Sequence, residues 1–283
     1  MKLLVLGPTG QLGRDLVRAA TRRAGIDVLT AGRDLLDLSE TASIGDALAD
    51  VGFDVLVNTA AFTAVDAAES DPATAFRVNA YAVEEIARAC ARGGRRLVQV
   101  STDYVFDGAS DRPYRPGDAP APLNVYGASK LAGEALARRE LPGATMVIRT
   151  SSVFGGAGSF VETMLRLARE RDRLRVEDDI TMAPTCSADL AGAILDLVVA
   201  DPGPGTWHLT NDGHATWYDL ARAILEAAGL DTPVDPVPSA EYPTPARRPR
   251  FSVLDTSAAV RIVGRLPSWS EALNRYLASR EKP

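Results

Sequence analysis

Short, almost continuously apolar runs alternate with longer segments of helical periodicity through the first half of the chain. The apolar runs occupy residues 2–7, 27–32, 53–61, 95–102 and 145–155. The helical segments occupy residues 11–25, 42–52, 72–94 and 125–140. Runs of valine, leucine and isoleucine without polar alternation are typical of parallel strands that are buried on both faces. The alternation therefore predicts an α/β fold in which right-handed crossovers build a doubly wound parallel sheet.

The regular alternation loosens after about residue 150. Two further helices are predicted at residues 158–172 and 216–229, each opened by a capping-box pattern. The boxes pair Ser159 with Glu162 and Thr216 with Asp219. Proline-rich connections surround these helices and carry too little periodic structure for a core of their own. We therefore expect a main domain at residues 1–150 and a smaller lobe at residues 151–283, with segments of the lobe returning to the main sheet.

Composition and charge narrow the class of protein. With 283 residues, of which 46% are apolar and 24% charged, the chain can bury one large core with an appended lobe. The net charge of −6 argues against nucleic-acid binding, because nucleic-acid-binding surfaces are basic. No apolar run approaches the roughly 18 residues of a membrane span. The first run is too short for a signal peptide, so we expect a cytoplasmic protein.

Histidine and cysteine are scarce, which limits the sites that the chain can build. The two histidines are His208 and His214, and the two cysteines, Cys90 and Cys186, lie far apart. A zinc site, a disulfide framework or a Ser-His-Asp triad is therefore not expected. His208 lies on an apparent strand, where we expect a structural role. Any chemistry must depend on other polar side chains or on a cofactor.

A glycine-rich turn follows the first predicted strand and opens the first predicted helix. Its glycines are Gly7, Gly10 and Gly13. In this context glycines permit a tight turn, a close approach of the backbone to a pyrophosphate, and close packing of helix on strand. The free amides at the helix N-terminus favour an anion. An ordinary strand–helix turn is the alternative, but the position after the first strand favours a dinucleotide site in residues 1–150.

Residues after the second predicted strand indicate which dinucleotide binds. Arg33 lies there, with Asp34 directly after it. An arginine at this place can hold the 2′-phosphate of NADP, whereas an acidic residue would bind the ribose 2′-hydroxyl of NAD. The order favours NADPH without excluding NADH. Asp37 and Leu38 could flank the adenine, and small side chains at Ala60 and Ala61 would let the dinucleotide cross the sheet edge.

Tyr126 and Lys130 lie four residues apart near the start of a predicted helix, on one face and one turn apart. An ordinary amphipathic helix with a surface lysine would show the same spacing. Thr102 and Asp103, however, end the fourth predicted strand, at the sheet edge where open α/β folds bind ligands. A turn-capping Thr-Asp pair is the alternative for these two residues.

Beside a nicotinamide, each of these side chains could contribute to the reduction of a ketone. Reduction of a ketone leaves a developing alkoxide, which Tyr126 can protonate if its pKa falls from about 10 towards neutrality. The Lys130 ammonium would stabilise the phenolate, lower that pKa and hold the nicotinamide ribose. The Thr102 hydroxyl would polarise the carbonyl. This chemistry requires no metal.

The three glycines, a threonine at the end of strand four and the Tyr-x-x-x-Lys spacing together resemble the extended short-chain dehydrogenase/reductase family. Longer segments narrow the resemblance to the branch of dTDP-4-dehydrorhamnose reductases. They are STDYVFDG (101–108), PLNVYGASKLAGE (122–134), VIRTS (147–151), WHLTNDG (207–213) and YPTPARRP (242–249). The resemblance covers essentially the whole chain. It implies a Rossmann fold and NADPH-dependent reduction of the 4-keto group of a nucleotide-linked sugar, giving dTDP-L-rhamnose.

Carried over by position, the resemblance also implies roles for individual residues. It makes Tyr126 the proton donor and Lys130 its partner, and it places Thr102 and Asp103 against the sugar carbonyl. It assigns Arg248 to the nucleotide diphosphate. It lines the cofactor with Gly10, Gln11, Leu12, Arg33, Asp37, Leu38, Ala60 and Ala61.

Two departures from the family pattern bear on the substrate and on a metal. Many members place a tryptophan against the sugar where this chain has Ser152, which opens the pocket. Some members bind magnesium through three carboxylates at a dimer contact. Asp15 matches the first only approximately and Asp189 the second at a shifted register, while the third has no evident counterpart. We therefore expect no metal, and both a homodimer and a monomer stay open.

Two alternatives to the leading interpretation remain. Ser152 keeps open a related reductase or epimerase that serves another nucleotide-linked deoxysugar. A catalytically silent, dinucleotide-binding regulatory subunit is the second alternative, since a subunit of methionine adenosyltransferase resembles the same branch. The intact set of Thr102, Tyr126 and Lys130 speaks against a silent subunit, which need not retain it.

Overall fold

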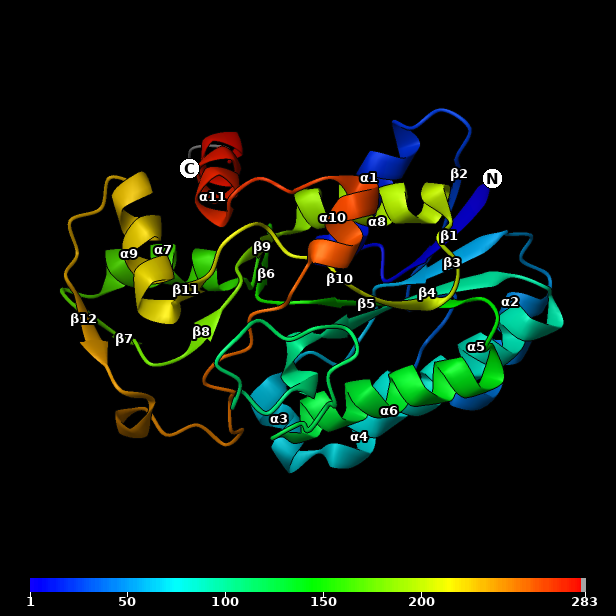
Figure 1. Cartoon of the computed structure of the whole chain (residues 1–283), viewed down its shortest axis with the longest axis horizontal. Helices are drawn as coiled ribbons and strands as arrows, with labels where there is room; N and C mark the ends of the chain where they lie inside the picture. The colour runs from blue at the N-terminus through cyan, green and yellow to red at the C-terminus, as the bar shows by residue number, and fades with distance from the viewer. Residues whose placement is uncertain (281–283) are drawn as a thin grey trace.

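A six-stranded sheet forms the centre of the molecule in a computed structural model that describes residues 1–280 (Figure 1). Its strands are β1 (Lys2–Leu6), β2 (Asp27–Ala31), β3 (Val55–Asn58), β4 (Arg96–Thr102), β5 (Thr145–Thr150) and β10 (Gly205–His208). They lie in the order β10-β5-β4-β3-β1-β2, and every neighbouring pair is parallel. The chain thus winds outward in both directions from β1. The doubly wound parallel sheet predicted from the sequence is confirmed.

Helices cover both faces of this sheet (Figure 1). One face carries α1 (Gln11–Thr21), α8 (Ser187–Ala200) and α10 (Ser257–Val263). The other face carries α2 (Ile44–Ala49), α5 (Ala82–Arg92) and α6 (Val125–Glu140), with α3 (Val65–Ser70) and α4 (Pro72–Phe76) packed against α6. The sheet is therefore buried on both sides, as its apolar strands require.

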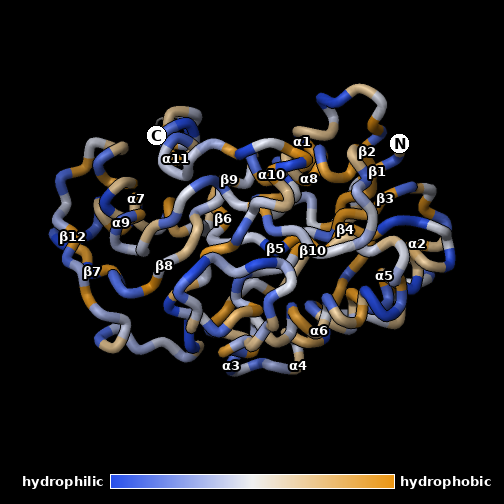
Figure 2. The backbone as a smooth tube through the Cα atoms, in the orientation of Figure 1, coloured by the Kyte–Doolittle hydropathy of each residue, from blue (hydrophilic) through white to orange (hydrophobic). Residues whose placement is uncertain are grey.

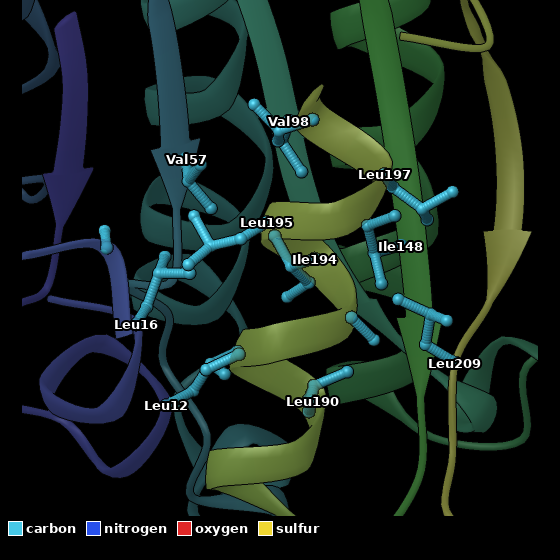
Figure 3. Close-up of a cluster of buried hydrophobic side chains, with 14 of the residues drawn as sticks. Leu12, Leu16, Val57, Val98, Ile148, Leu190, Ile194, Leu195, Leu197 and Leu209 are labelled. Atoms are coloured by element: carbon cyan, nitrogen blue, oxygen red, sulfur yellow. The ribbon is translucent and has the colours of Figure 1, made fainter. Parts of the chain in front are cut away.

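Successive strand residues point to opposite faces of the sheet and enter two different apolar clusters. In β1, Leu3 and Val5 pack under α1 and α8, while Leu4 and Leu6 pack under α2 and α5. Figure 3 shows the first cluster, in which Ile194 of α8 lies over the sheet between Val98 and Ile148. Hydrophobic residues accordingly concentrate around the sheet strands (Figure 2). This two-sided burial explains why the strands lack a polar alternate position.

The helices of the first half match the predicted segments, with local differences. The segment at residues 72–94 forms one continuous helical run, in which a π-helical turn, η2 (Arg77–Tyr81), joins α4 to α5. Asp71 caps its start by accepting a hydrogen bond from the Thr74 amide. A 3₁₀ turn, η1 (Thr41–Ser43), precedes α2. The sequence analysis did not predict the short helix α3.

Those parts of the second half of the chain that do not return to the sheet form a lobe beside the carboxyl ends of its strands (Figure 1). Its helices are α7 (Phe160–Glu170), α9 (Trp217–Ala227) and α11 (Trp269–Ser279). Its short strands are β6 (Val153–Phe154), β7 (Leu174–Glu177), β8 (Thr181–Met182), β9 (Thr185–Cys186), β11 (Ala215–Thr216) and β12 (Val234–Val237). Three strand pairs form, β6 with β9 and β7 with β12 in parallel, and β8 with β11 antiparallel. Two 3₁₀ turns, η3 (Asp103–Val105) and η4 (Ser239–Glu241), complete the elements.

The lobe helices bury an apolar cluster of their own, which the sequence analysis did not expect. Leu165 of α7, Ile224 of α9 and Leu273 of α11 are its central members. The Thr216–Asp219 capping box of α9 is confirmed in full. At α7 only half of the box forms, because the carboxylate of Glu162 binds Tyr276 and Arg280 instead of the cap amide. The Glu162 side chain therefore links the start of α7 to the C-terminal part of α11.

His208 on β10 is fully buried, and the structural role expected from the sequence agrees with its contacts. Its Nδ1 lies 3.0 Å from the Tyr114 carbonyl oxygen, and its ring packs edge-on against Phe106. Burial, and next the nearby Arg149 guanidinium, lower the pKa of His208 from 6.5 to about 4. The folded state therefore prefers the neutral imidazole.

This preference predicts a pH dependence of the free energy of unfolding. The unfolded chain takes up a proton at His208 below about pH 6.5, whereas the folded chain does so only near pH 4. The His208 contribution is thus fully present above pH 6.5 and is lost as the pH falls towards 4, by up to about 3 kcal/mol. Urea unfolding at both ends of this range should show a smaller loss for His208→Gln than for wild type. If both proteins lost the same free energy of unfolding over this pH range, the pH dependence could not be assigned to His208.

In the part of the chain that the structure describes, no helix is both long and apolar enough to cross a membrane.

Candidate functional site

A cavity of about 590 Å³ lies at the carboxyl ends of β1, β3, β4 and β5. It brings together most of the residues singled out from the sequence. These are Gly7, Gly10, Gln11, Leu12, Gly13, Ala60, Ala61, Thr102, Tyr126, Lys130 and Ser152. The carboxyl edge of an open parallel sheet is where such folds bind ligands. The three predicted catalytic residues therefore share one cavity with most of the predicted cofactor residues.

The glycine turn has a shape that side chains would fill. Gly7 adopts a φ of +74°, and a Cβ on Gly13 would lie 2.0 Å from the Gly7 carbonyl oxygen. This contact lets α1 begin directly against the turn. The α1 N-cap, Gly10, offers no side-chain cap, so the first amides of α1 stay free for an anion. The Gln11 Oε1 atom is buried there without a hydrogen-bond partner in residues 1–280. These features fit the pyrophosphate of a dinucleotide.

Three predicted cofactor residues do not line this cavity. Arg33 is exposed after the end of β2, and Asp37 accepts hydrogen bonds from the amide and hydroxyl of Ser39, both at 2.8 Å. These bonds, more than the nearby Arg33, lower the pKa of Asp37. Leu38 packs into the apolar cluster under α2 and α5. The loop after β2 therefore lies outside the wall of this cavity.

Lys130 is buried on α6, and its Nζ donates a hydrogen bond to the Val100 carbonyl oxygen at 2.6 Å. Burial lowers the pKa of Lys130 to about 8, while the carboxylate of Glu134 one turn further along α6 opposes that shift. The ammonium form thus still predominates at neutral pH. Lys130 is in this way fixed at the floor of the cavity by the strand that carries Thr102.

Tyr126 differs from the expectation that its pKa falls towards neutrality. Burial raises the pKa of Tyr126 to about 12, and an interaction with the Thr102 hydroxyl opposes this shift only in part. The physical reason is that desolvation of the phenolate outweighs its stabilisation, while the Lys130 ammonium binds Val100. In this structure Tyr126 is therefore a phenol that retains its proton.

Asp103 is a buried carboxyl group surrounded by hydroxyl donors. Ser252 donates to its Oδ2 at 2.6 Å and Ser151 at 2.7 Å, and Thr102 donates to Oδ1 at 3.1 Å. Burial raises the pKa of Asp103, and the three hydroxyls oppose that shift. Asp103 thereby ties the ends of β4 and β5 to the loop at residue 252.

A second, smaller hollow of about 160 Å³ adjoins the first and shares Thr102, Tyr126 and Ser152 with it. Asp103 also lines it, and the lobe supplies Trp217 from the start of α9. Ser152 adopts a φ of +42°, a left-handed conformation that costs a residue other than glycine roughly 1–3 kcal/mol. Such strain is typical of ligand sites. The small Ser152 and the large Trp217 together shape this hollow.

Arg248 lies at a third hollow of about 510 Å³, which meets the second at Ile180. Its guanidinium forms an ion pair with Asp66 of α3 at 2.8 Å. This interaction, ahead of a hydrogen bond from the Ala246 amide, lowers the pKa of Asp66. Glu177 also lines the hollow. Shared lining residues thus connect the three hollows in order from the glycine turn to Arg248.

Behind the cavity, Glu134 of α6 forms a buried ion pair with Arg149 of β5. Arg149 Nε and Nη2 donate to the two carboxylate oxygens at 2.9 and 2.7 Å, and Ser101 of β4 donates at 2.6 Å. Glu134 and Arg149 are only 0% and 3% exposed. Glu134 therefore joins α6, which carries Tyr126 and Lys130, to β4, which carries Thr102, and to β5.

The sequence analysis missed several residues of the site. Those at the first two hollows include Thr59, Thr63, Val100, Ser101, Tyr104, Thr150, Ser151, Trp217 and Ser252. Thr150 ends β5 and Ser151 follows it, just as Thr102 ends β4 and Asp103 follows it. Their position at a strand end was therefore a usable signal. Trp217 and Ser252 carry no such signal, because the fold brings them in from the lobe.

The carboxylates considered for magnesium are each engaged elsewhere. Asp15 accepts a hydrogen bond from Ser187, and Asp189 binds Arg275 and Asn211, both at 2.8 Å. Within residues 1–280, no group of three or more His, Cys, Asp or Glu side chains is placed to hold a metal ion.

Comparison with known proteins places the chain in a family. Residues 1–281 match the family described as RmlD substrate binding domain. A dTDP-4-dehydrorhamnose reductase from Mycobacterium tuberculosis is 43% identical over 287 residues, covering 98% of this chain and 93% of that protein. The spore coat polysaccharide biosynthesis protein SpsK of Bacillus subtilis is 39% identical over 280 residues, covering 99% and 98%.

A solved structure gives the same result. The dTDP-4-dehydrorhamnose reductase from Bacillus anthracis, in complex with NADP, superimposes with a TM-score of 0.92 at 32% identity and covers 99% of both chains. Both the sequence and the architecture are thus shared over almost the whole length. The chain belongs to the RmlD family of dTDP-4-dehydrorhamnose reductases.

Proposed function

We propose that this protein uses NADPH to reduce the 4-keto group of dTDP-4-dehydro-L-rhamnose, which gives dTDP-L-rhamnose. One observation carries the proposal most directly: Tyr126 and Thr102 line both the cavity of the glycine turn and the adjoining smaller hollow. A proton donor at this junction can serve a sugar in the second hollow while the cofactor occupies the first. The names of the relatives supply the identity of the sugar.

NADPH, when bound, supplies the hydride that reduces the carbonyl carbon. Tyr126 donates its phenolic proton to the oxygen at C4 as negative charge develops there. Its raised pKa, about 12, keeps that proton in place until the oxygen becomes a stronger base. The Thr102 hydroxyl, at the end of β4, would polarise the carbonyl by exchanging its hydrogen bond to Asp103 for one to the carbonyl oxygen. Lys130, anchored on Val100, would hold the nicotinamide ribose, and its positive charge would favour the phenolate that remains.

The remaining hollows accommodate the rest of the substrate. The deoxysugar occupies the hollow of about 160 Å³, which Asp103, Ser152 and Trp217 line. The nucleotide diphosphate extends into the hollow of about 510 Å³, where Arg248 would exchange part of its contact with Asp66 for phosphate oxygens.

The proposed location is the cytoplasm, and a homodimer is the proposed assembly, to be tested by sedimentation.

A second candidate is a reductase or epimerase for another nucleotide-linked deoxysugar. Ser152 favours this candidate, because a serine in place of the tryptophan of many family members leaves more room in the hollow for sugars with different substituents. Assaying NADPH oxidation with a panel of dTDP-4-keto sugars separates the two candidates. The first predicts the highest kcat/KM with dTDP-4-dehydro-L-rhamnose, and a higher value for a different sugar would favour the second.

The cofactor preference is a separate prediction. Arg33 is exposed after β2 and free to contact a 2′-phosphate. We expect NADPH to bind more tightly than NADH, and Arg33→Ala to weaken NADPH binding by roughly tenfold, the loss of a charge-assisted contact. Fluorescence titration with NADH provides the matched control, because NADH lacks that phosphate. Equal losses for both cofactors would show that Arg33 does not recognise the 2′-phosphate.

Magnesium gives another prediction. Asp15 and Asp189 already bind Ser187 and Arg275, so we expect activity to survive exhaustive chelation with little change. The measurement is the rate of NADPH oxidation before and after EDTA treatment. Activity that disappears with EDTA and returns on adding magnesium would overturn this expectation.

A further inference from the structure

Thr150, the last residue of β5, has a buried hydroxyl group without a partner. Its side chain is only 5% exposed, and its Oγ1 makes no hydrogen bond with any group in residues 1–280. Buried hydroxyl groups are nearly always hydrogen-bonded, because leaving one unsatisfied costs stability. A fold that retains such a group at the edge of a cavity keeps a binding group available for a ligand.

The surroundings of Thr150 show which ligand the hydroxyl faces. Thr150 pairs in register with Thr102 across β4 and β5, and it lines the cavity of about 590 Å³ with Tyr126 and Lys130. It does not line the adjoining hollow of about 160 Å³, whereas the next residue, Ser151, lines only that hollow. The backbone alternation at the end of β5 thus directs Thr150 to the cofactor and Ser151 to the sugar.

The strand order locates Thr150 along the cofactor. The glycine turn follows β1 and Ala60 follows β3, while Thr102 and Thr150 end β4 and β5. These four strands are successive neighbours in the sheet. A dinucleotide whose pyrophosphate lies at the glycine turn, and which crosses this edge towards Lys130, ends with its nicotinamide beside β5. The carboxamide of nicotinamide carries both a donor and an acceptor, and a hydroxyl group can pair with either.

We propose that the Thr150 hydroxyl binds the nicotinamide carboxamide and thereby orients the ring towards the sugar. The proposal rests on the proposed NADPH-dependent function. It makes Thr150 a cofactor-binding residue, and it explains why the hydroxyl is unsatisfied in the protein alone.

Thr145 at the other end of β5 offers a matched control. Its side chain is 1% exposed, but its hydroxyl donates to the Leu141 carbonyl oxygen at 2.7 Å. Thr145 therefore has the same residue type, strand and burial as Thr150, with a satisfied hydrogen bond. Valine at either position preserves shape and removes only the hydroxyl group.

The test compares Thr150→Val, Thr150→Ser and Thr145→Val in two measurements without substrate. Thr150→Val is expected to raise the Kd for NADPH by roughly three- to tenfold, the effect of one hydrogen bond. Its thermal midpoint without cofactor should be unchanged or higher, because an unsatisfied group is removed. Thr150→Ser should restore NADPH binding. Thr145→Val should lower the thermal midpoint and leave the Kd unchanged.

A truncated cofactor shows which part of NADPH is recognised. ADP-ribose 2′-phosphate, which lacks nicotinamide, should bind Thr150→Val and wild type equally. A lower thermal midpoint with an unchanged Kd would overturn the proposal, as would equal losses for NADPH and for the truncated compound. Wild-type protein that fails to bind NADPH would instead overturn the proposed function itself, so the two failures are distinguishable.

Discussion

Tyr126→Phe is expected to lower kcat by about 10²–10⁴-fold with dTDP-4-dehydro-L-rhamnose, the usual cost of losing a positioned proton donor. Phenylalanine keeps the ring and its edge-on packing against Tyr104, whose ring centre lies 6.0 Å away. The fold should therefore persist, and so should NADPH binding. Steady-state kinetics measures the first effect, and thermal unfolding and fluorescence titration check the other two.

Tyr104→Phe is the matched control for this experiment. Tyr104 lines the hollow of about 160 Å³, which we propose for the sugar, but not the cavity of about 590 Å³, which we propose for the cofactor. Tyr104 is therefore not at the junction of the two, which Tyr126 occupies. We expect a smaller loss of kcat than for Tyr126→Phe. Near-wild-type turnover by Tyr126→Phe would mean that Tyr126 and Lys130 are an ordinary helix face.

Glu134→Gln is expected to lower the free energy of unfolding by about 3–5 kcal/mol, because it leaves the buried Arg149 guanidinium without its counter-charge. Both partners are almost completely buried, and two hydrogen bonds join them. Urea unfolding at neutral pH measures the loss. Adding Arg149→Met to the same protein should recover part of it, because the uncompensated charge is then removed.

Arg138→Ala provides the contrast. Arg138 also contacts Glu134, at 3.2 Å, but its side chain is 37% exposed, so its loss should cost at most about 1 kcal/mol. Equal, small effects of Glu134→Gln and Arg138→Ala would contradict the account of the buried pair. Burial lowers the pKa of Lys130, and the Glu134 carboxylate opposes that shift. In Glu134→Gln protein, the alkaline loss of activity should consequently begin at a lower pH.

The sequence predicts those features of the fold and of the site that depend on residues close together in the chain. The apolar strands, the glycine turn after β1 and the Tyr126–Lys130 spacing all depend on neighbours within a few positions. Helix α8 was missed because its residues are buried on nearly every side, so its segment lacks the polar stripe that marks an amphipathic helix. The lobe cluster was missed because it joins three helices that are far apart in the chain.

Contacts between distant segments account for what the sequence did not reveal about the site. Ser252 donates a hydrogen bond to Asp103, which lies 149 positions earlier in the chain. Trp217 of the lobe lines the hollow of about 160 Å³. The pKa of Tyr126 was expected to fall because Lys130 is one turn away. Spacing alone does not report the burial that raises this pKa, or the bond that directs Lys130 to Val100.

The reduction itself provides the most direct test of the proposed function. Purified protein would be mixed with NADPH and dTDP-4-dehydro-L-rhamnose, with NADPH loss followed by absorbance and the sugar product identified by NMR. We expect equimolar oxidation of NADPH and formation of dTDP-L-rhamnose. Folded protein that binds NADPH but leaves this sugar unreduced would contradict it.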